Sequence, residues 1–251
     1  MHAILYIAGR AMRLGPLAAA RNKVLLDFEG KTLLERHVMI LEKVGISKLY
    51  LVTGHLRENV QAVMPSLSQR YGIALEELYN PDFTEGSILS MHASLPALVN
   101  VSDSALIMDG DVLYDARMLQ RLLDSPHRTA LLVDRDYSTI DDDPVLVPLR
   151  AGKPFEFVKK WKPAPGQPAD AVGESVGFFK IHSDDLPHLI RETCARTSGA
   201  ARAESYDEAL RALVKTGHFG AEDITGLPWT EIDFPHDLDY AAKFILPALQ
   251  H

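Results

Sequence analysis

Several features that would assign the protein to a special class are scarce in this sequence. Cys194 is the only cysteine among 251 residues, so no disulfide can form within the chain. No apolar run approaches the roughly 18 residues that a membrane-spanning helix needs. Residues 1–6 lack the basic segment and the cleavage-like site of a signal peptide. Together these absences predict a cytoplasmic protein that does not insert into a membrane.

Cationic residues and metal-binding patterns are also in short supply. Lysine and arginine number 26 against 34 aspartates and glutamates, which gives a net charge of −8. A dedicated nucleic-acid binder would usually carry a basic face, so the sequence predicts no nucleic-acid partner. The ten histidines show none of the paired spacings of zinc sites. A nucleotide-binding enzyme is still compatible with this charge, because such a site needs only a few local cations and a metal.

The sequence does contain enough apolar surface for a core, since hydrophobic residues make up 47% of the chain. In the first half, short buried strands alternate with segments of helical spacing. This alternation is typical of βαβ units and of a mostly parallel sheet with helices on both faces. The expected strands cover residues 3–8, 48–53, 74–79 and 105–108, and the expected helices cover residues 33–44 and 57–64.

The second half has a more mixed pattern. No internal repeat or long linker divides the chain, so we expect a single α/β domain over residues 1–251 with a small substrate-side lobe. Residues 141–144 and 163–168 are expected to be loops. The other expected elements are strands at 129–134, 145–149, 155–161 and 176–181, and helices at 186–196, 206–216 and 238–249.

The loop after the first expected strand has the character of an anion-binding site. The strand ends at Ala8 and Gly9, and the loop carries Arg13 and Lys23 before the apolar segment 24–26. Main-chain N–H groups beside a glycine, together with two nearby cations, suit a polyphosphate. An ordinary solvated surface loop is the alternative, but the spacing between two apolar segments favours the anion site.

Two acidic segments offer the ligand types that Mg²⁺ prefers. Asp109 and Asp111 follow the fourth expected strand directly, and Glu231 and Asp233 lie on one side of a short extended segment near the C-terminus. Mg²⁺ takes one or two carboxylates together with phosphate oxygens and water. The alternatives are a polar turn that ends a strand, and a solvated strand edge before a helix that begins near Asp237.

Four segments resemble the nucleotide-binding motifs of the nucleotidyltransferases related to the sugar-1-phosphate nucleotidyltransferases. The family pattern reads A-G-x-G-x-R-L, then P-K-x-L-L, then G-x-x-L-L-E-R, then V-T-G. Ala11 replaces the second glycine of this pattern, and Asn22 replaces the proline. Alanine restricts the backbone if a positive φ is required at that position. The corresponding segments lie at residues 8–14, 22–26, 30–36 and 52–54.

Further segments narrow the resemblance to cytidylyltransferases that act on small phospho- or phosphono-alcohols and amines, such as the bacterial phosphocholine and 2-aminoethylphosphonate cytidylyltransferases. These segments are Asp109-Gly110-Asp111-Val112, residues 229–238, and residues 80–91, which are similar to N-P-x-Y-x-x-T-N-N-x-x-S-L. Glu85 and Gly86 replace the asparagine pair of that pattern, so the identity of the acceptor stays open.

The resemblance implies a Rossmann-like, GT-A-type fold with a nucleotide-binding half (1–125) and an acceptor-binding half (126–251). It implies transfer of CMP from CTP to a small acceptor that bears phosphate or phosphonate, with Mg²⁺ as cofactor and release of pyrophosphate. Lys23 would hold the α-phosphate and the acceptor oxygen, and Arg13 the β- and γ-phosphates. The implied metal ligands are Asp111 and Asp233, with Glu231 as a further one, and the implied nucleotide contacts are Ala8, Gly9, Ser87, Ser90 and Asp109.

Other functions share parts of this pattern. A sugar-1-phosphate or inositol-phosphate nucleotidyltransferase would share the motifs, and a non-catalytic nucleotide-sensing subunit would share the binding loop. A glycosyltransferase would share the Asp-x-Asp pattern, but Arg13 and Lys23 argue against it, because that reaction does not take place at the α-phosphate. An acidic or aromatic pocket beside Lys23 would favour a cationic acceptor, which Tyr206 and Trp161 are able to cage by cation–π contact. The sequence also leaves a homodimer open.

Overall fold

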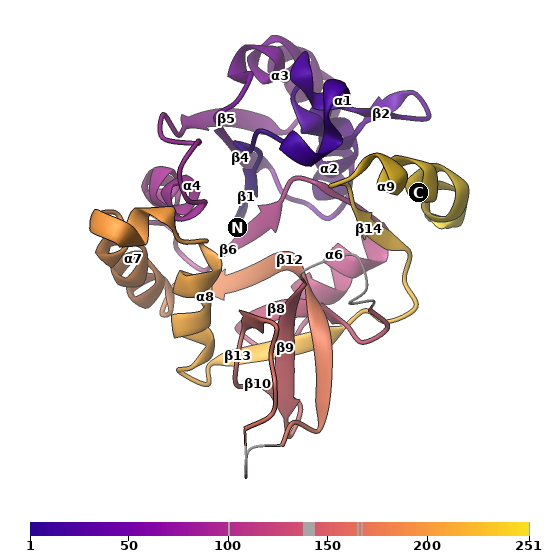
Figure 1. The fold of residues 1–251 in the computed structure, drawn as a ribbon. Helices are drawn as coiled ribbons and strands as arrows, with labels where there is room; N and C mark the ends of the chain where they lie inside the picture. The colour runs from indigo at the N-terminus through magenta and orange to yellow at the C-terminus, as the bar shows by residue number, and fades with distance from the viewer. Residues whose placement is uncertain (100, 138–143, 165, 167, 251) are drawn as a thin grey trace.

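The computed structural model describes the chain apart from residues 100, 138–143, 165, 167 and 251 (Figure 1). Its centre is a large mixed sheet with the strand order β10-β9-β12-β6-β1-β4-β5, and β8 and β13 continue from β12. The strands of this sheet are β1 His2–Tyr6, β4 Lys48–Thr53, β5 Ala74–Tyr79, β6 Ser104–Asp109, β8 Thr129–Asp134, β9 Val145–Arg150, β10 Lys153–Pro154, β11 Val158–Lys159, β12 Ala171–His182 and β13 Phe219–Asp223.

The half of the sheet built from the start of the chain is parallel. Strand β1 pairs in parallel with both β4 and β6, and β4 pairs in parallel with β5. The other half turns antiparallel at β12, which pairs with β6, β8 and β9. The ends of β1, β4 and β6 therefore lie at one edge of the sheet, where parallel α/β sheets bind their ligands.

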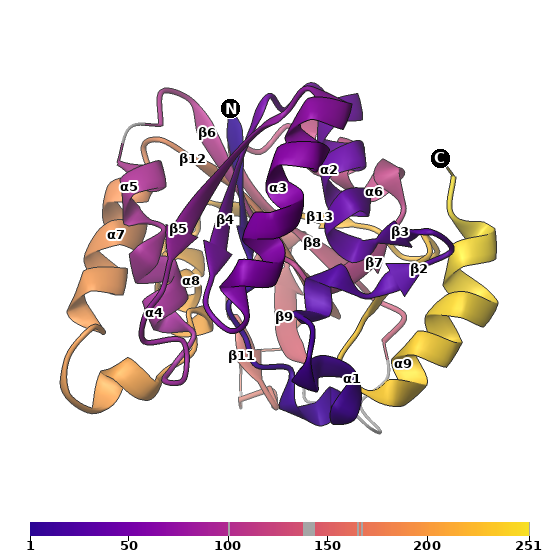
Figure 2. The ribbon, with the colours of Figure 1, turned by 90° about the horizontal axis from the view of Figure 1, so that it is seen from above.

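Helices cover both faces of the sheet, as the alternation of elements predicts (Figure 2). Alternate residues of β1 point to opposite faces, so Leu5 packs into one core and Ile4 into the other, and both are fully buried. Helices α2 Leu33–Lys43, α3 Arg57–Tyr71 and α6 Ala116–Leu123 cover the face of Leu5. The face of Ile4 is covered by α4 Ile88–Ala93, α5 Leu95–Leu98, α7 Leu186–Ala195 and α8 Asp207–Val214.

Several boundaries differ from the prediction for physical reasons. Helix α3 was expected to end near residue 64, but it continues to Tyr71 through Pro65. Val60 and Leu67 anchor the helix in the core on both sides of the proline. The expected strand 155–161 is wrong except for β11, because Lys160 has a left-handed backbone (φ 53°) that ends the pairing with β9.

Some elements have no counterpart in the prediction. Helix α6 begins at Asp115, whose carboxylate accepts a hydrogen bond from the Arg117 N–H, and it buries Met118, Leu119 and Leu122. Strand β13 pairs in parallel with β8. The expected helix 238–249 is split into α9 Pro235–Tyr240, a π-helix over Ala241–Ile245 and a 3₁₀ turn over Leu246–Ala248. Most of the expected loop 141–144, and residues 165 and 167 of the loop 163–168, lie outside the described residues.

Among the described residues, no helix has both the length and the apolar character that crossing a bilayer requires.

Candidate functional site

A short antiparallel ribbon brings the two acidic segments together. Strand β7 Val112–Tyr114 follows the Asp109–Asp111 turn and pairs with β14 Trp229–Glu231. The pairing sets Glu231 opposite Val112, and the Ile232 N–H donates to the Asp111 carbonyl at 2.9 Å. The turn itself requires Gly110, because a Cβ there would lie 2.2 Å from the side chain of Ile7, just after β1. Asp111 and Asp233 are thereby brought to the same edge of the sheet.

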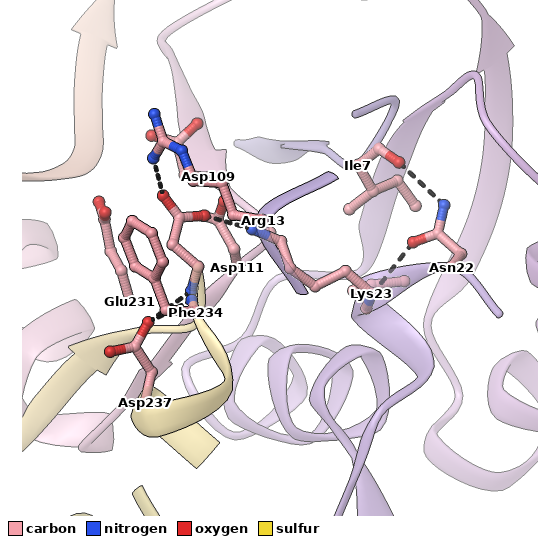
Figure 3. Close-up of polar contacts among 12 residues, drawn as sticks. Ile7, Arg13, Asn22, Lys23, Asp109, Asp111, Glu231, Phe234 and Asp237 are labelled. Atoms are coloured by element: carbon pink, nitrogen blue, oxygen red, sulfur yellow. Dashed lines mark hydrogen bonds and ion pairs between the residues drawn. The ribbon is translucent and has the colours of Figure 1, made fainter. Parts of the chain in front are cut away.

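Lys23 lies between these two carboxylates (Figure 3). Its ammonium donates to Asp111 Oδ2 and to Asp233 Oδ1, each at 2.8 Å. The side chain is only 15% exposed. Burial alone would lower the pKa of Lys23, but the charges of Asp111 and Asp233 more than offset this and hold the pKa above its ordinary value. The lysine therefore stays protonated across the physiological pH range.

The carboxylate of Asp233 is fixed from both sides. Burial would raise its pKa, but the neighbouring charges of Lys23 and Arg13 keep the pKa below its ordinary value. Arg13 Nη1 donates to Asp233 Oδ2 at 2.9 Å, and its guanidinium lies over the Phe234 ring. Asp237 lies in the first turn of helix α9, as predicted for an acid at the helix start, and its carboxylate accepts the backbone N–H groups of Asp233 and Phe234. The helix start thus holds Asp233 in place.

Ala11, one of the two departures from the family pattern in these motifs, lies in the loop that carries Arg13 and Lys23. Ala11 has a left-handed backbone (φ 49°) immediately before the 3₁₀ turn Met12–Leu14. A residue with a side chain pays a conformational cost there that glycine does not. Ala11 therefore adopts a backbone conformation that favours glycine, the residue of the family pattern at this position.

An open cleft of about 410 Å³ extends from these acids across the edge of the sheet. A second hollow of about 270 Å³ adjoins it, shares Arg13, Asp111 and Asp233, and includes Lys23. The predicted nucleotide contacts Ala8, Gly9, Ser87, Ser90 and Asp109 all line the larger cleft. The cleft lining also includes Phe83, Glu85, Lys159, Glu174, Tyr206 and Asp207.

Three of the predicted nucleotide contacts are already engaged within the protein. Ser90 is buried, and its hydroxyl accepts a hydrogen bond from Asn80 at 3.1 Å. The Ser87 hydroxyl accepts the Tyr206 N–H at 3.1 Å. Asp109 Oδ2 accepts the Tyr206 hydroxyl at 2.5 Å. These residues hold the walls of the cleft together, and their contacts with a nucleotide stay a prediction.

Tyr206 lines the cleft, and no pattern in the sequence predicts where its hydroxyl lies. Its ring lies in the cleft beside Tyr6, with the ring centroids 5.2 Å apart, and its hydroxyl reaches Asp109. Trp161, the other expected member of a cation–π cage, contacts Phe155 and does not line the cleft. Tyr206 and Trp161 therefore do not form an aromatic cage in this structure.

Residues 199–206, which we call the strap, pack against Glu85 and Gly86, the two residues that replace the asparagine pair of the family pattern. The Gly86 N–H donates to the Arg202 carbonyl at 3.0 Å. The Arg202 guanidinium donates two hydrogen bonds to the Glu85 carboxylate, at 2.8 and 2.7 Å. A bidentate pair of this kind is geometrically specific. The strap thereby carries Tyr206 to Asp109 and joins the two sides of the cleft.

Gly86→Ala is expected to lower the free energy of unfolding by about 1–3 kcal/mol, the usual cost of overpacking. An added Cβ would lie 2.2 Å from the Glu204 carbonyl oxygen, which is backbone and cannot rotate away. Denaturant melts would measure the change. Gly9→Ala is the matched control, since its added methyl group meets nothing within 4 Å. Equal stability of the two variants would contradict the tight docking of the strap.

The acidic side chains fit a divalent cation bound together with a phosphate. In the part of the chain that the structure describes, no three His, Cys, Asp or Glu side chains form a ready-made metal cage. Asp111 and Asp233, however, each direct an oxygen at the same ammonium, so two hard donors already face one cation. Mg²⁺ is commonly held by one or two carboxylates, with phosphate oxygens and waters filling the other positions. Glu231 lies nearby, and burial and then the charges of Asp111 and Asp109 raise its pKa.

The family model and the fold are those of a nucleotidyltransferase. The chain belongs to the MobA-like NTP transferase domain family, whose model matches residues 3–218.

Individual relatives agree with this assignment. The chain is 27% identical to CMP-5'-(3-aminopropyl)phosphonate synthase from Streptomyces rubellomurinus, over 94% of this chain but only 37% of that protein. It is 23% identical to the CTP:phosphoglutamine cytidylyltransferase of Campylobacter jejuni, over 95% of this chain and 98% of that one. A solved structure of CTP:phosphocholine cytidylyltransferase from Streptococcus pneumoniae matches with a TM-score of 0.76 at 18% identity, over 96% and 97% of the two chains.

These comparisons confirm the predicted fold class and the resemblance to nucleotidyltransferases. The mixed, mostly parallel sheet with flanking helices is the fold of the matched structures. The division into halves at residue 125, the cytoplasmic location and the homodimer stay predictions.

Proposed function

We propose that this protein is a Mg²⁺-dependent cytidylyltransferase that transfers CMP from CTP to a small acceptor carrying a phosphate or phosphonate and a positive charge. The observation that carries this proposal is the position of Lys23 between Asp111 and Asp233, beside a cleft whose lining includes further acidic and aromatic side chains. The relatives named above, which act on CTP or on phosphonate and phosphoglutamine compounds, support the choice of CTP and of this acceptor class.

In the proposed reaction, an acceptor oxygen attacks the α-phosphorus of CTP. A new P–O bond forms, the bond to the β-phosphate oxygen breaks, and pyrophosphate leaves with the electron pair. The attacking phosphate or phosphonate oxygen is already anionic, so no general base has to remove a proton. Positioning and charge stabilisation then account for the rate.

Lys23 and Arg13, the two cations of the loop, suit the two groups that carry negative charge in this reaction, the α-phosphate and the departing pyrophosphate. Lys23 is nearly buried and always charged, so it can hold the α-phosphate and the acceptor oxygen together. Arg13 is 61% exposed beside the cleft and can turn toward the β- and γ-phosphates of the leaving group by exchanging its contact with Asp233. A divalent ion held by Asp111 and Asp233 would draw negative charge from the triphosphate.

Part of the cleft lining favours an acceptor with an ammonium group over a neutral polyol. Asp207 and Glu174 add carboxylates to the lining, and Tyr206 and Phe83 add aromatic rings. The Glu85 charge is matched by Arg202, so we assign the attraction for a cation to Asp207. Asp207 also accepts a hydrogen bond from the Ser205 hydroxyl at 2.7 Å, which fixes its orientation. An acidic wall of this kind disfavours a second anionic group on the acceptor.

The direct test is a pyrophosphate-release assay with each of the four ribonucleoside triphosphates in the presence of Mg²⁺. The acceptor panel contains 2-aminoethylphosphonate, phosphocholine, inositol-1-phosphate and glucose-1-phosphate. We expect CTP with an ammonium-bearing acceptor to give the highest kcat/KM. Turnover only with a sugar phosphate would overturn the acceptor assignment. Tight CTP binding with no turnover on the whole panel would favour a nucleotide-sensing role.

Asp207→Asn is expected to raise the KM of the ammonium acceptor by about tenfold to hundredfold. A hydrogen bond to a charged group is worth about 1.5–3 kcal/mol, which corresponds to that factor. The KM of CTP should change little, because Asp207 belongs to α8 and not to the loop that bears Lys23. Initial-rate kinetics with each substrate varied would measure both constants.

Glu208→Gln is the matched control for this experiment. Glu208 is the next residue on α8, does not line the cleft, and pairs with Arg211. We expect it to leave both KM values close to those of the wild type. An unchanged acceptor KM in Asp207→Asn would show that the positive charge of the acceptor is held elsewhere.

A further inference from the structure

Asn22 is a buried amide that joins three segments of the chain beside the lysine of the site. Its side chain is 2% exposed. The amide nitrogen donates to the Ile7 carbonyl at 3.1 Å and to the His55 carbonyl at 2.9 Å. The amide oxygen accepts the Val24 N–H at 3.1 Å, so it caps the 3₁₀ turn Lys23–Leu25 (Figure 3).

Both amide hydrogens and the amide oxygen are used, which explains why the residue is asparagine. The two acceptors are backbone carbonyls, which have no hydrogen to offer in return. A carboxylate in the same place would face two carbonyl oxygens, and a buried mismatch of that kind is costly. Alanine would leave the Ile7 and His55 carbonyls without this donor.

The three segments joined by Asn22 are the ones that place the reactive groups. Ile7 lies just after β1, where the anion-binding loop begins, and His55 lies in the loop between β4 and α3. The His55 N–H also donates to the Ala8 carbonyl at 3.0 Å, so the two loops are tied twice. The third segment is the turn whose first residue is Lys23. In the family pattern a proline stands at this position, and proline has no side-chain donor with which to make these contacts.

We propose that Asn22 is a positioning residue for Lys23: it fastens the lysine turn to the ends of β1 and β4 and so fixes the ammonium between Asp111 and Asp233. The proposal rests on the proposed function for its effect on turnover, but not for its effect on the lysine itself. Displacing a reacting group by about 1 Å can cost about a hundredfold in rate, so loss of the fastening acts mainly on kcat.

The test compares Asn22→Asp and Asn22→Ala with Asn59→Asp. Asn59 lies on α3, outside both the cleft and the adjoining hollow, and makes the same amide-to-acid change away from the lysine turn. Two quantities are measured well below the melting temperature of each variant. One is the split between kcat and the KM of CTP, and the other is the rate at which an acylating reagent modifies Lys23, followed by mass spectrometry with the exposed Lys48 as internal reference.

We expect kcat to fall about 10–100-fold in both Asn22 variants, with Asn22→Asp the lower, while the KM of CTP stays within about threefold. Acylation of Lys23 should become several-fold faster relative to Lys48, and Asn59→Asp should match the wild type in both measurements. A lower melting temperature with unchanged kcat and unchanged Lys23 acylation would overturn the proposal, because Asn22 would then be merely structural. If the wild type transfers no CMP to any acceptor, the proposed function fails, and the acylation rates alone decide the role of Asn22.

Discussion

Replacing Lys23 with alanine is expected to lower kcat by about 10²–10³-fold while the protein still folds. Preorganised donors aimed at the charge that develops in a transition state are commonly worth this much. The ammonium of Lys23 lies 2.8 Å from Asp111 and from Asp233, so its removal also leaves two carboxylates facing each other without a cation. Turnover of saturating CTP and acceptor would measure the loss.

Arg21→Ala is the control for this experiment. Arg21 belongs to the same loop and is exposed, but it lines neither the cleft nor the adjoining hollow. Its loss should leave kcat within about twofold, because an exposed cation away from the phosphates contributes little. Near wild-type turnover of Lys23→Ala would remove the lysine from the proposed chemistry.

Asp111→Asn and Asp233→Asn are each expected to lower turnover by about 10²–10³-fold and to raise the Mg²⁺ concentration needed for half-maximal rate. The two carboxylates come from distant parts of the chain but face one cation, so they form a single unit. Residues that act as a unit have non-additive effects, and the double variant should therefore lose little more than either single one. Rates measured across a Mg²⁺ titration test both expectations.

Asp239→Asn serves as the control, because Asp239 is an exposed acid on α9 that does not line the cleft. The same Mg²⁺ dependence in the wild type and in all the acid variants would show that the metal is held by other groups. A strictly additive double variant would separate the roles of Asp111 and Asp233.

The parts of this architecture that depend on short stretches of chain were predictable. Residues 3–8 are almost entirely apolar and end at Gly9, so a buried strand followed by a loop is the natural interpretation. Helix α2 begins at Thr32, whose hydroxyl accepts the Glu35 N–H, and Gly45 follows its end with a positive φ. Both signals are local, since a cap and a stop need only neighbouring residues.

The parts that depend on contacts between distant segments were not predictable in the same way. Strand β14 has three residues, and its pairing with β7 cannot be told from a solvated edge by its alternation alone. Tyr206 was a candidate for a cage, but its hydroxyl contact with Asp109 depends on the docking of the strap. Asn22 was visible as a departure from the family pattern, but its three partners lie in segments up to 33 residues away.

If Asp233 holds the metal as proposed, the ribbon of β7 and β14 also sets the moment at which this protein can begin to work. Asp233 follows Lys23 by 210 residues, so at 5–20 residues per second a ribosome adds it roughly 10–40 s later. The central sheet does not include β14. A nascent chain that stops before residue 229 would hold every strand of that sheet and the lysine loop, yet it would lack one of the two acids. The enzyme would thus be inert until nearly all of this domain has been made.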